Sequence, residues 1–275
     1  MQRSLFQRAA ASPHIVWSVL FIIAPLAFVF YYAFTDAAGN FTMANMAQLL
    51  EPNYRTVFLR SIAFAVIATI VCLILAYPTA LAISRAKPKT QRLLIMLVML
   101  PMWMNFLIRT YSWMAILENN GIINRFLSLL GIGPVQLINT PFAVILGMVY
   151  NFLPYMVLPI YTVISKLDPR VIEAAADLGC TPLQTVFKVT LPMSLSGVLS
   201  GITMVFVPAV STFYISQKLG GTDTVLIGDV IERQFKQGNN PNLGAALSLV
   251  LMLLVFVCTG IMNRFGADEE GGVIA

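Results

Sequence analysis

The sequence predicts an all-α membrane protein with six transmembrane helices and a single membrane domain over residues 1–275, and three observations support this. The chain is 58% hydrophobic and 11% charged, whereas soluble domains are nearer half apolar and a quarter charged. The apolar residues gather in six stretches, each about the length that a helix needs to cross a bilayer. Basic residues are divided unequally between the segments that join these stretches.

The six apolar stretches are residues 14–34, 61–84, 93–117, 141–165, 194–217 and 243–262. Five contain no Asp, Glu, Lys or Arg, and the third contains Arg109. The first is longer than a signal-peptide core and lacks a clear cleavage site, so we expect it to be retained as a helix. All but the last contain or begin with proline, which packed membrane helices tolerate. These prolines indicate either ordinary kinking or helices that rock to open a path.

The charge pattern predicts the orientation of the chain. The N-terminal tail, the second–third and fourth–fifth connections and the C-terminal tail together hold ten basic residues. The alternate segments hold six. Basic residues concentrate on the cytosolic side of membrane proteins, so both termini are expected in the cytosol. The second–third connection gives the clearest signal, with Arg85, Lys87, Lys89 and Arg92.

Several classes of protein are disfavoured by what the sequence lacks. There is one histidine, the three cysteines have no metal-ligand spacing, and no phosphate-binding glycine motif occurs, so we expect no catalytic residue, metal or cofactor site. No Asp or Glu lies within a predicted span. A stand-alone secondary transporter would need such acids for ion coupling, and a membrane enzyme would need clustered catalytic side chains. Nothing indicates binding to nucleic acid.

The fourth–fifth connection, residues 166–192, is predicted to form two short helices on the cytosolic side. Asp168 and Pro169 are favourable first residues of a helix, and Gly179 stands where a helix-ending glycine is expected. Thr181 and Gln184 then have the spacing of a capping box. Apolar side chains of the second helix follow at Val186, Phe187 and Val189. The connection is either a solvated amphipathic elbow or a docking element for a cytosolic partner.

The same connection carries a resemblance to a known family. Its pattern resembles the EAA loop of bacterial ABC importer permeases, which has Glu-Ala-Ala, then Gly, then Ile-x-Leu-Pro at fixed spacing. The matching residues are Glu173, Ala174, Ala175, Gly179, Val189, Leu191 and Pro192, with valine in place of isoleucine. The resemblance implies that Glu173, Ala174, Ala175, Asp177, Gly179, Leu191 and Pro192 couple the chain to an ATPase. It also implies the type I ABC importer permease fold with a cytosolic two-helix coupling loop.

Further segments are similar to the spermidine/putrescine permeases of this superfamily, and the similarity covers about Leu50 to Leu254. They are Pro101-x-Trp103, Leu107 to Trp113, Gly147 to Tyr155, Glu173 to Gly179, Gly220-Gly221 and Gln234-Phe235. The resemblance implies a multi-pass subunit of the bacterial cytoplasmic membrane that imports polyamines. Relatives that carry ferric, sulfate or other small solutes share parts of these motifs, so those solutes remain alternatives.

The resemblance also implies partners. They are a second permease subunit, two cytosolic ATPase subunits, an extracytoplasmic solute-binding protein and membrane lipid. ATP and Mg would be used by the ATPase, so this chain is not itself expected to be an enzyme.

Five residues are candidates for the solute path or a gate: Arg109, Tyr111, Trp113, Tyr150 and Tyr214. Arg109 either extends to the outer surface or acts as a structural partner or gate, and as a cation it is not expected to bind a polyamine. The aromatic residues are explained either by interfacial belts or by cation–π contacts along the path. Without an acid in any span, we expect no tight solute site in this chain.

Overall fold

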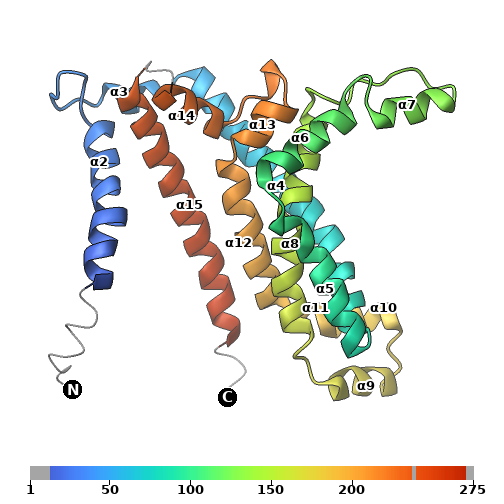
Figure 1. The fold of residues 1–275 in the computed structure, drawn as a ribbon. Coiled ribbons are helices and arrows are strands. Elements are labelled where there is room, and N and C mark those ends of the chain that lie inside the picture. The colour runs from blue at the N-terminus through green and yellow to red at the C-terminus, as the bar shows by residue number, and fades with distance from the viewer. Residues whose placement is uncertain (1–12, 237–239, 271–275) are drawn as a thin grey trace, which may run out of the picture. The chain divides into compact units, whose positions relative to one another are not determined.

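The computed structural model describes residues 13–236 and 240–270, and this part of the chain is helical with one isolated bridge between Thr35 and Phe41. The elements are η1 (Val19–Ile23), α2 (Ala24–Ala33), α3 (Ala44–Gln48), α4 (Pro52–Ser84), α5 (Pro88–Trp103), α6 (Phe106–Leu117), α7 (Ile122–Leu129), α8 (Pro141–Ile164), α9 (Pro169–Asp177), α10 (Pro182–Thr185), η2 (Val186–Thr190), α11 (Leu191–Met193), α12 (Leu195–Ser211), α13 (Tyr214–Leu219), η3 (Thr222–Thr224), α14 (Ile227–Lys236) and α15 (Pro241–Glu270) (Figure 1). The predicted all-α class is confirmed.

Four helices in the described ranges are long and apolar enough to cross a membrane: Pro13–Ala33, Pro52–Ser84, Pro141–Ile164 and Pro241–Met262. Two further pairs of helices meet the same criterion but are bent, and counting each pair as one span gives six. The four straight spans correspond to four predicted stretches, although Pro52–Ser84 begins nine residues earlier than the predicted span at 61–84.

The predicted span 93–117 is not one straight helix. α5 ends at Trp103 and α6 begins at Phe106, and the pair is bent by 90°. Met104 has extended backbone, Asn105 has a non-helical backbone with ψ 129°, and the Asn105 side chain accepts a hydrogen bond of 2.8 Å from the Leu107 N–H. The bend therefore exists because Asn105 caps a new helix inside an otherwise apolar stretch.

The predicted span 194–217 also differs from the structure. α12 starts at Leu195 and ends at Ser211, and it is bent by 70° from the segment Pro182–Met193. Thr212 and Phe213 interrupt the helix before the short α13. The 70° bend lies at the predicted junction between the loop and the span. Hydropathy does not register the break at Thr212 and Phe213, because the apolar composition continues through it.

The chain divides into two compact units, which we describe separately; the single domain predicted from sequence stays a prediction. Unit 1 comprises Met1–Thr56 and Val230–Leu254, and unit 2 comprises Val57–Asp229 and Val255–Ala275.

Unit 1 is held together where the end of α2 meets the start of α15. Ala33, Ala245, Ala246 and Leu249 form a buried cluster there. The buried Asn242 amide donates to the backbone oxygen of Thr35 at 2.7 Å and to that of Tyr32 at 3.2 Å. Because the last carbonyls of a helix have no partner within it, this side chain satisfies the end of α2.

The loop after α2 is closed by Asp36. Its carboxylate accepts hydrogen bonds from the backbone N–H groups of Asn40 at 2.8 Å and Ala38 at 2.9 Å. The bonds to Asn40 are the main reason that the pKa of Asp36 lies below its ordinary value of 3.8.

The core of unit 2 is α8, the most buried of the four candidate spans. Of the residues in its most apolar 18-residue segment, 61% are buried. α12 packs along it through two glycines. A Cβ on Gly197 would lie 2.9 Å from the Pro159 carbonyl oxygen, and one on Gly201 would lie 2.7 Å from the Met156 sulfur. Small residues in this spacing let two helix backbones approach closely, as in other membrane helix pairs.

Candidate functional site

The first half of the loop at 166–192 has the predicted local structure. The Asp168 carboxylate caps α9 by accepting a hydrogen bond of 3.0 Å from the Arg170 N–H. Gly179 has φ +82°, and the N–H groups of Gly179 and Cys180 donate to the carbonyls of Ala176 and Ala175. These two bonds form the glycine-terminated helix end known as a Schellman motif. The predicted positions of the cap and of the glycine turn are confirmed.

The second half of the loop is less regular than predicted. Thr181 and Gln184 form the predicted capping box at the start of α10, with both reciprocal hydrogen bonds present. The helix then passes into a π-helical turn, η2, and ends with α11 at Met193. Val186 and Val189 are half-buried, but Phe187 is 61% exposed and so does not pack against the chain. The expected apolar side of this helix is therefore only partly buried.

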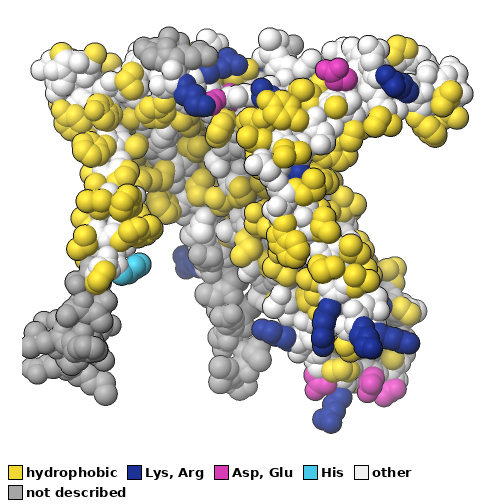
Figure 2. Space-filling model, in the orientation of Figure 1, with side chains coloured by type: hydrophobic (Ala, Val, Ile, Leu, Met, Phe, Trp, Pro, Cys, Tyr) yellow, Lys and Arg dark blue, Asp and Glu magenta, His cyan; other side chains and the backbone are white. Residues whose placement is uncertain are grey.

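The outer surface of this loop combines exposed acids with exposed large apolar side chains. Glu173 and Asp177 are exposed on α9, and Leu178 and Leu183 are 85% and 69% exposed. With Phe187 they form a surface that we call the loop face. Figure 2 shows basic and acidic side chains gathered around this end of unit 2. An isolated solvated loop has no need of three exposed large apolar side chains, so this composition indicates a contact surface.

The predicted coupling residues do not all lie on the loop face. Ala174, Gly179 and Pro192 are exposed, as are both acids, whereas Ala175 is buried and Leu191 is half-buried. Ala175 and Leu191 are thus covered by the chain itself, and α9, which carries Ala175, packs on α10 and η2 of the same loop.

A second group of candidates comes together at the opposite end of unit 2, where α6 and α13 meet (Figure 1). The rings of Tyr111 and Tyr214 lie 6.3 Å apart in an edge-on arrangement. Phe106 lies 5.8 Å from the Tyr214 ring. The Lys218 ammonium nitrogen lies 5.4 Å from the centre of the Tyr111 ring and 5.8 Å from that of Tyr214. We call Phe106, Tyr111, Tyr214 and Lys218 the aromatic cage.

Two members of the aromatic cage, Phe106 and Lys218, were not predicted as site residues. Lys218 follows Tyr214 by four residues, a spacing that puts both on one face of a helix, so the sequence did contain a signal for it. Phe106 carries no comparable signal, because its contact with α13 depends on the bend after α5.

Trp113 and Tyr150 form a separate pair. Their rings lie 5.3 Å apart at 70°, and they join α6 to α8. The structure therefore divides the four predicted aromatic candidates between two contacts.

Arg109 is on α6, beyond the 90° bend, and only 8% exposed. It does not extend to the surface. Its guanidinium carbon lies 5.8 Å from the centre of the Phe106 ring, and its Nε and Nη1 atoms are buried with no hydrogen-bond partner among the described residues. A buried donor without an acceptor is costly, so this side chain is the least satisfied polar group of the site.

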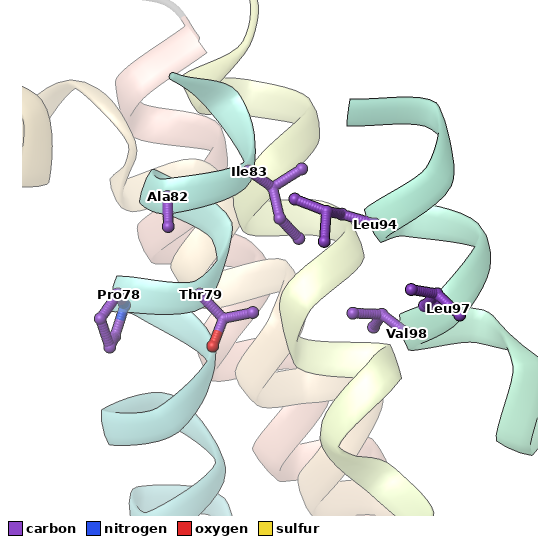
Figure 3. Close-up of a pocket in the computed structure, with 7 residues that line it drawn as sticks. All are labelled: Pro78, Thr79, Ala82, Ile83, Leu94, Leu97 and Val98. Carbon is purple, nitrogen blue, oxygen red and sulfur yellow. The ribbon is translucent and has the colours of Figure 1, made fainter. Parts of the chain in front are cut away.

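A groove between α4 and α5 has a volume of about 570 Å³ (Figure 3). It is lined by Pro78, Thr79, Ala82, Ile83, Leu94, Leu97 and Val98. The only side-chain polar atom in this lining is the Thr79 hydroxyl, which already donates to the Leu75 carbonyl at 2.6 Å. The groove therefore offers no free polar group for a charged solute.

Comparisons with known proteins agree with this arrangement. A family model described as the binding-protein-dependent transport system inner membrane component matches residues 73–267. The chain is 40% identical to the spermidine/putrescine transport system permease protein PotB of Haemophilus influenzae, over 94% of this chain and 96% of the relative. It is 39% identical to the protein of the same name from Escherichia coli, over 87% of this chain and 90% of the relative.

Solved structures give the fold. A bacterial ABC transporter involved in the import of the acidic polysaccharide alginate contains a chain that matches with a TM-score of 0.78 and 18% identity, covering 96% of this chain and 95% of that one. The MetNI methionine ABC transporter, in an inward-facing conformation, matches with a TM-score of 0.62 and 18% identity, covering 81% and 97%. The predicted permease fold is confirmed by this similarity.

Proposed function

Because the chain belongs to the family of binding-protein-dependent transport system inner membrane components, we propose that it is the permease subunit of an ATP-driven importer of polyamines such as spermidine and putrescine. The observation that carries the solute class is the 40% identity to a spermidine/putrescine permease over nearly the whole of both chains. The chain supplies part of the membrane path for the solute.

The loop face is the proposed contact with a cytosolic ATPase. Leu178, Leu183 and Phe187 offer apolar area, and Glu173 and Asp177 offer charge that can select and orient a partner. The buried Ala175 and the helix caps hold this surface in one shape. Closure of the ATPase would then displace the loop and with it the attached helices. In this proposal ATP and Mg are used by the partner and not by this chain.

The proposed assembly contains a second permease, two ATPase subunits and an extracytoplasmic solute-binding protein. Both termini and the loop face are in the cytosol, in keeping with the excess of basic residues in those segments. Tyr111, Trp113, Tyr150 and Tyr214 are the proposed path residues, since aromatic faces can accept a passing ammonium group without holding it tightly. Affinity resides in the binding protein.

The solute is tested by uptake. A host strain that lacks its own polyamine importers should accumulate labelled putrescine or spermidine when this chain and its partners are supplied. Labelled sulfate and ferric iron, tested in the matching knockout strains, are the controls. Uptake of either control in place of both polyamines would assign the chain to the same class of importer with a different solute.

The coupling role is tested with Glu173→Ala in the reconstituted complex. An interfacial charge that loses its partner costs about 2 kcal/mol or more, so ATP hydrolysis stimulated by the binding protein should fall at least about tenfold. Uptake should fall in parallel while the chain remains in the membrane. Lys89→Ala, which removes an exposed charge in the first turn of α5, is the matched control. If Glu173→Ala keeps full stimulated hydrolysis with the ATPase still bound, the loop only connects two spans and does not couple the chain to the ATPase.

A further inference from the structure

The aromatic cage already contains a primary ammonium group. Lys218 places its Nζ over the rings of both Tyr111 and Tyr214, at 5.4 and 5.8 Å from their centres. The two rings lie 6.3 Å apart in an edge-on arrangement, so one nitrogen is within reach of both. Aromatic ring faces around one nitrogen are the contacts by which proteins recognise alkylammonium ions.

We propose that the aromatic cage is a binding site for the terminal ammonium group of the transported solute, and that Lys218 is its resting occupant, which the solute displaces. This inference rests on the proposed function. It adds a named site, a chemical class of ligand, namely a primary alkylammonium ion, and an internal competitor for that site.

Lys218 is suited to leave the cage. Its side chain is half-exposed, and the Tyr111 ring beside it is 45% exposed, so both can be reached from outside the unit. A lysine ammonium is a point charge on a flexible four-carbon stem, and it can withdraw without moving the backbone. Two ammonium groups cannot occupy the same rings together, because like charges at such a separation repel.

The rest of α13 does not depend on Lys218. Ile215 and Leu219 are buried and pack into the space that Gly147 of α8 leaves without a side chain. The N–H groups of Gln217 and Gly220 donate to the carbonyls of Phe213 and Ser216. Loss of the lysine side chain should therefore leave the helix and both tyrosines in place. Lys218→Met thus removes the competing ammonium group and keeps the aromatic rings.

The exchange of one ammonium group for another also explains how the aromatic cage could bind a cation without a carboxylate. One ammonium group lies over the two tyrosine rings both before and after the solute enters, so the exchange does not require a carboxylate among them. While the Lys218 ammonium group lies over the rings, other cations cannot bind there. Because this group is attached to α13, its local concentration at the rings stays high. A solute delivered at high concentration to the cage can still replace it.

The first test measures displacement directly. In the purified complex, Lys218 is labelled with an amine-reactive reagent, and the labelled peptide is quantified by mass spectrometry with and without tetramethylammonium. That ion binds aromatic cages but has no reactive N–H. Labelling should rise about two- to fivefold when it is added, the factor expected for one exposed cation–π contact. Tyr214→Leu should give high labelling that no longer responds. Labelling that ignores tetramethylammonium in the unaltered complex would overturn the proposal.

The second test uses labelled putrescine and the reconstituted transporter with a limiting amount of its binding protein. Lys218→Met should raise uptake at low putrescine about two- to fivefold, because the competitor is gone. Lys218→Arg, which keeps a cation on the rings, should not. Lys236→Met removes an exposed lysine elsewhere and is the charge control.

Unchanged uptake in Lys218→Met, at normal membrane levels, would overturn the role of the lysine. Failure of the unaltered complex to import putrescine with saturating binding protein would instead overturn the proposed function, and the labelling test would still decide whether the cage binds an ammonium ion.

Discussion

Arg109 keeps two guanidinium nitrogens buried without an acceptor, in contact with the Phe106 ring. Folding normally avoids this, because an unpaired buried donor loses its hydration without compensation. We therefore expect its planar shape or its charge to be used in another state of the assembly. Its position next to the aromatic cage also adds a second cation to the surroundings of the solute site.

The use of Arg109 can be tested by substitution. We expect Arg109→Lys to reach the membrane at normal levels but to lower polyamine uptake, since an ammonium cannot reproduce the planar fork of a guanidinium. Arg109→Met should raise the thermal unfolding temperature of the purified chain, because about 1–3 kcal/mol of unpaired-donor cost is removed. Normal uptake in both variants would exclude Arg109 from transport.

Gly179 requires a conformation that other residues adopt only with strain. Its φ is +82°, and a Cβ built there would meet nothing within 4 Å, so the backbone alone opposes substitution. Gly179→Ala should destabilise the loop by about 1 kcal/mol and reduce stimulated ATP hydrolysis. Gly179→Asn should be milder, because asparagine tolerates the left-handed region. Equal activity of both variants with the unaltered chain would show that the turn does not orient the loop face.

At the scale of elements, Asn242 joins two helices of unit 1. The Nδ2 atom of this residue lies within hydrogen-bond distance of carbonyl oxygens from Tyr32, Thr35 and Asp36. Asn242→Asp would replace the donor with a carboxylate facing these oxygens, so we expect a loss of about 2 kcal/mol in local stability. Faster hydrogen exchange at residues 33–36 would report it.

Asn240 provides the matched control for that experiment. Its side-chain oxygen accepts a hydrogen bond of 3.1 Å from the Leu243 N–H at the start of α15. Asn240→Asp keeps an acceptor at a helix start and should be nearly neutral. If both substitutions accelerate hydrogen exchange at residues 33–36 equally, the hydrogen bonds of the Asn242 amide do not stabilise the end of α2.

The elements that the sequence predicts well are those fixed by neighbouring residues. Asp168, Gly179 and the Thr181–Gln184 pair each act within four positions of the chain, so their types and spacing were sufficient. The bend after Trp103 and the break at Thr212 and Phe213 were missed, because hydropathy averages over a window and a single capping Asn105 does not lower it. The aromatic cage was found only in part, since the contact of Phe106 with Tyr214 joins residues more than a hundred positions apart.

At the scale of the whole molecule, the orientation of the chain in the membrane is still a prediction, based on ten basic residues against six. Cysteine placed at Lys87 or Gln184 in an otherwise cysteine-free chain should be shielded from a membrane-impermeant thiol reagent in intact cells. Cysteine placed at Asn53 should react. All three positions are exposed in the chain itself, so a difference in labelling reports the membrane side. The opposite pattern would invert the topology.

The close packing of α8 and α12 has a mechanical consequence. α8 has Gly147 against α13 near one end, and at its other end Ile164 is separated by four residues from the start of α9. Gly197 and Gly201 bring α12 so near to α8 that the two helices have no room to slide past each other freely. They should therefore respond to force as one stiff rod. A displacement of a few ångströms at the loop face would then move Tyr111 and Tyr214 by a similar amount through a tilt of the helix pair. No other moving element would be needed to connect the two ends.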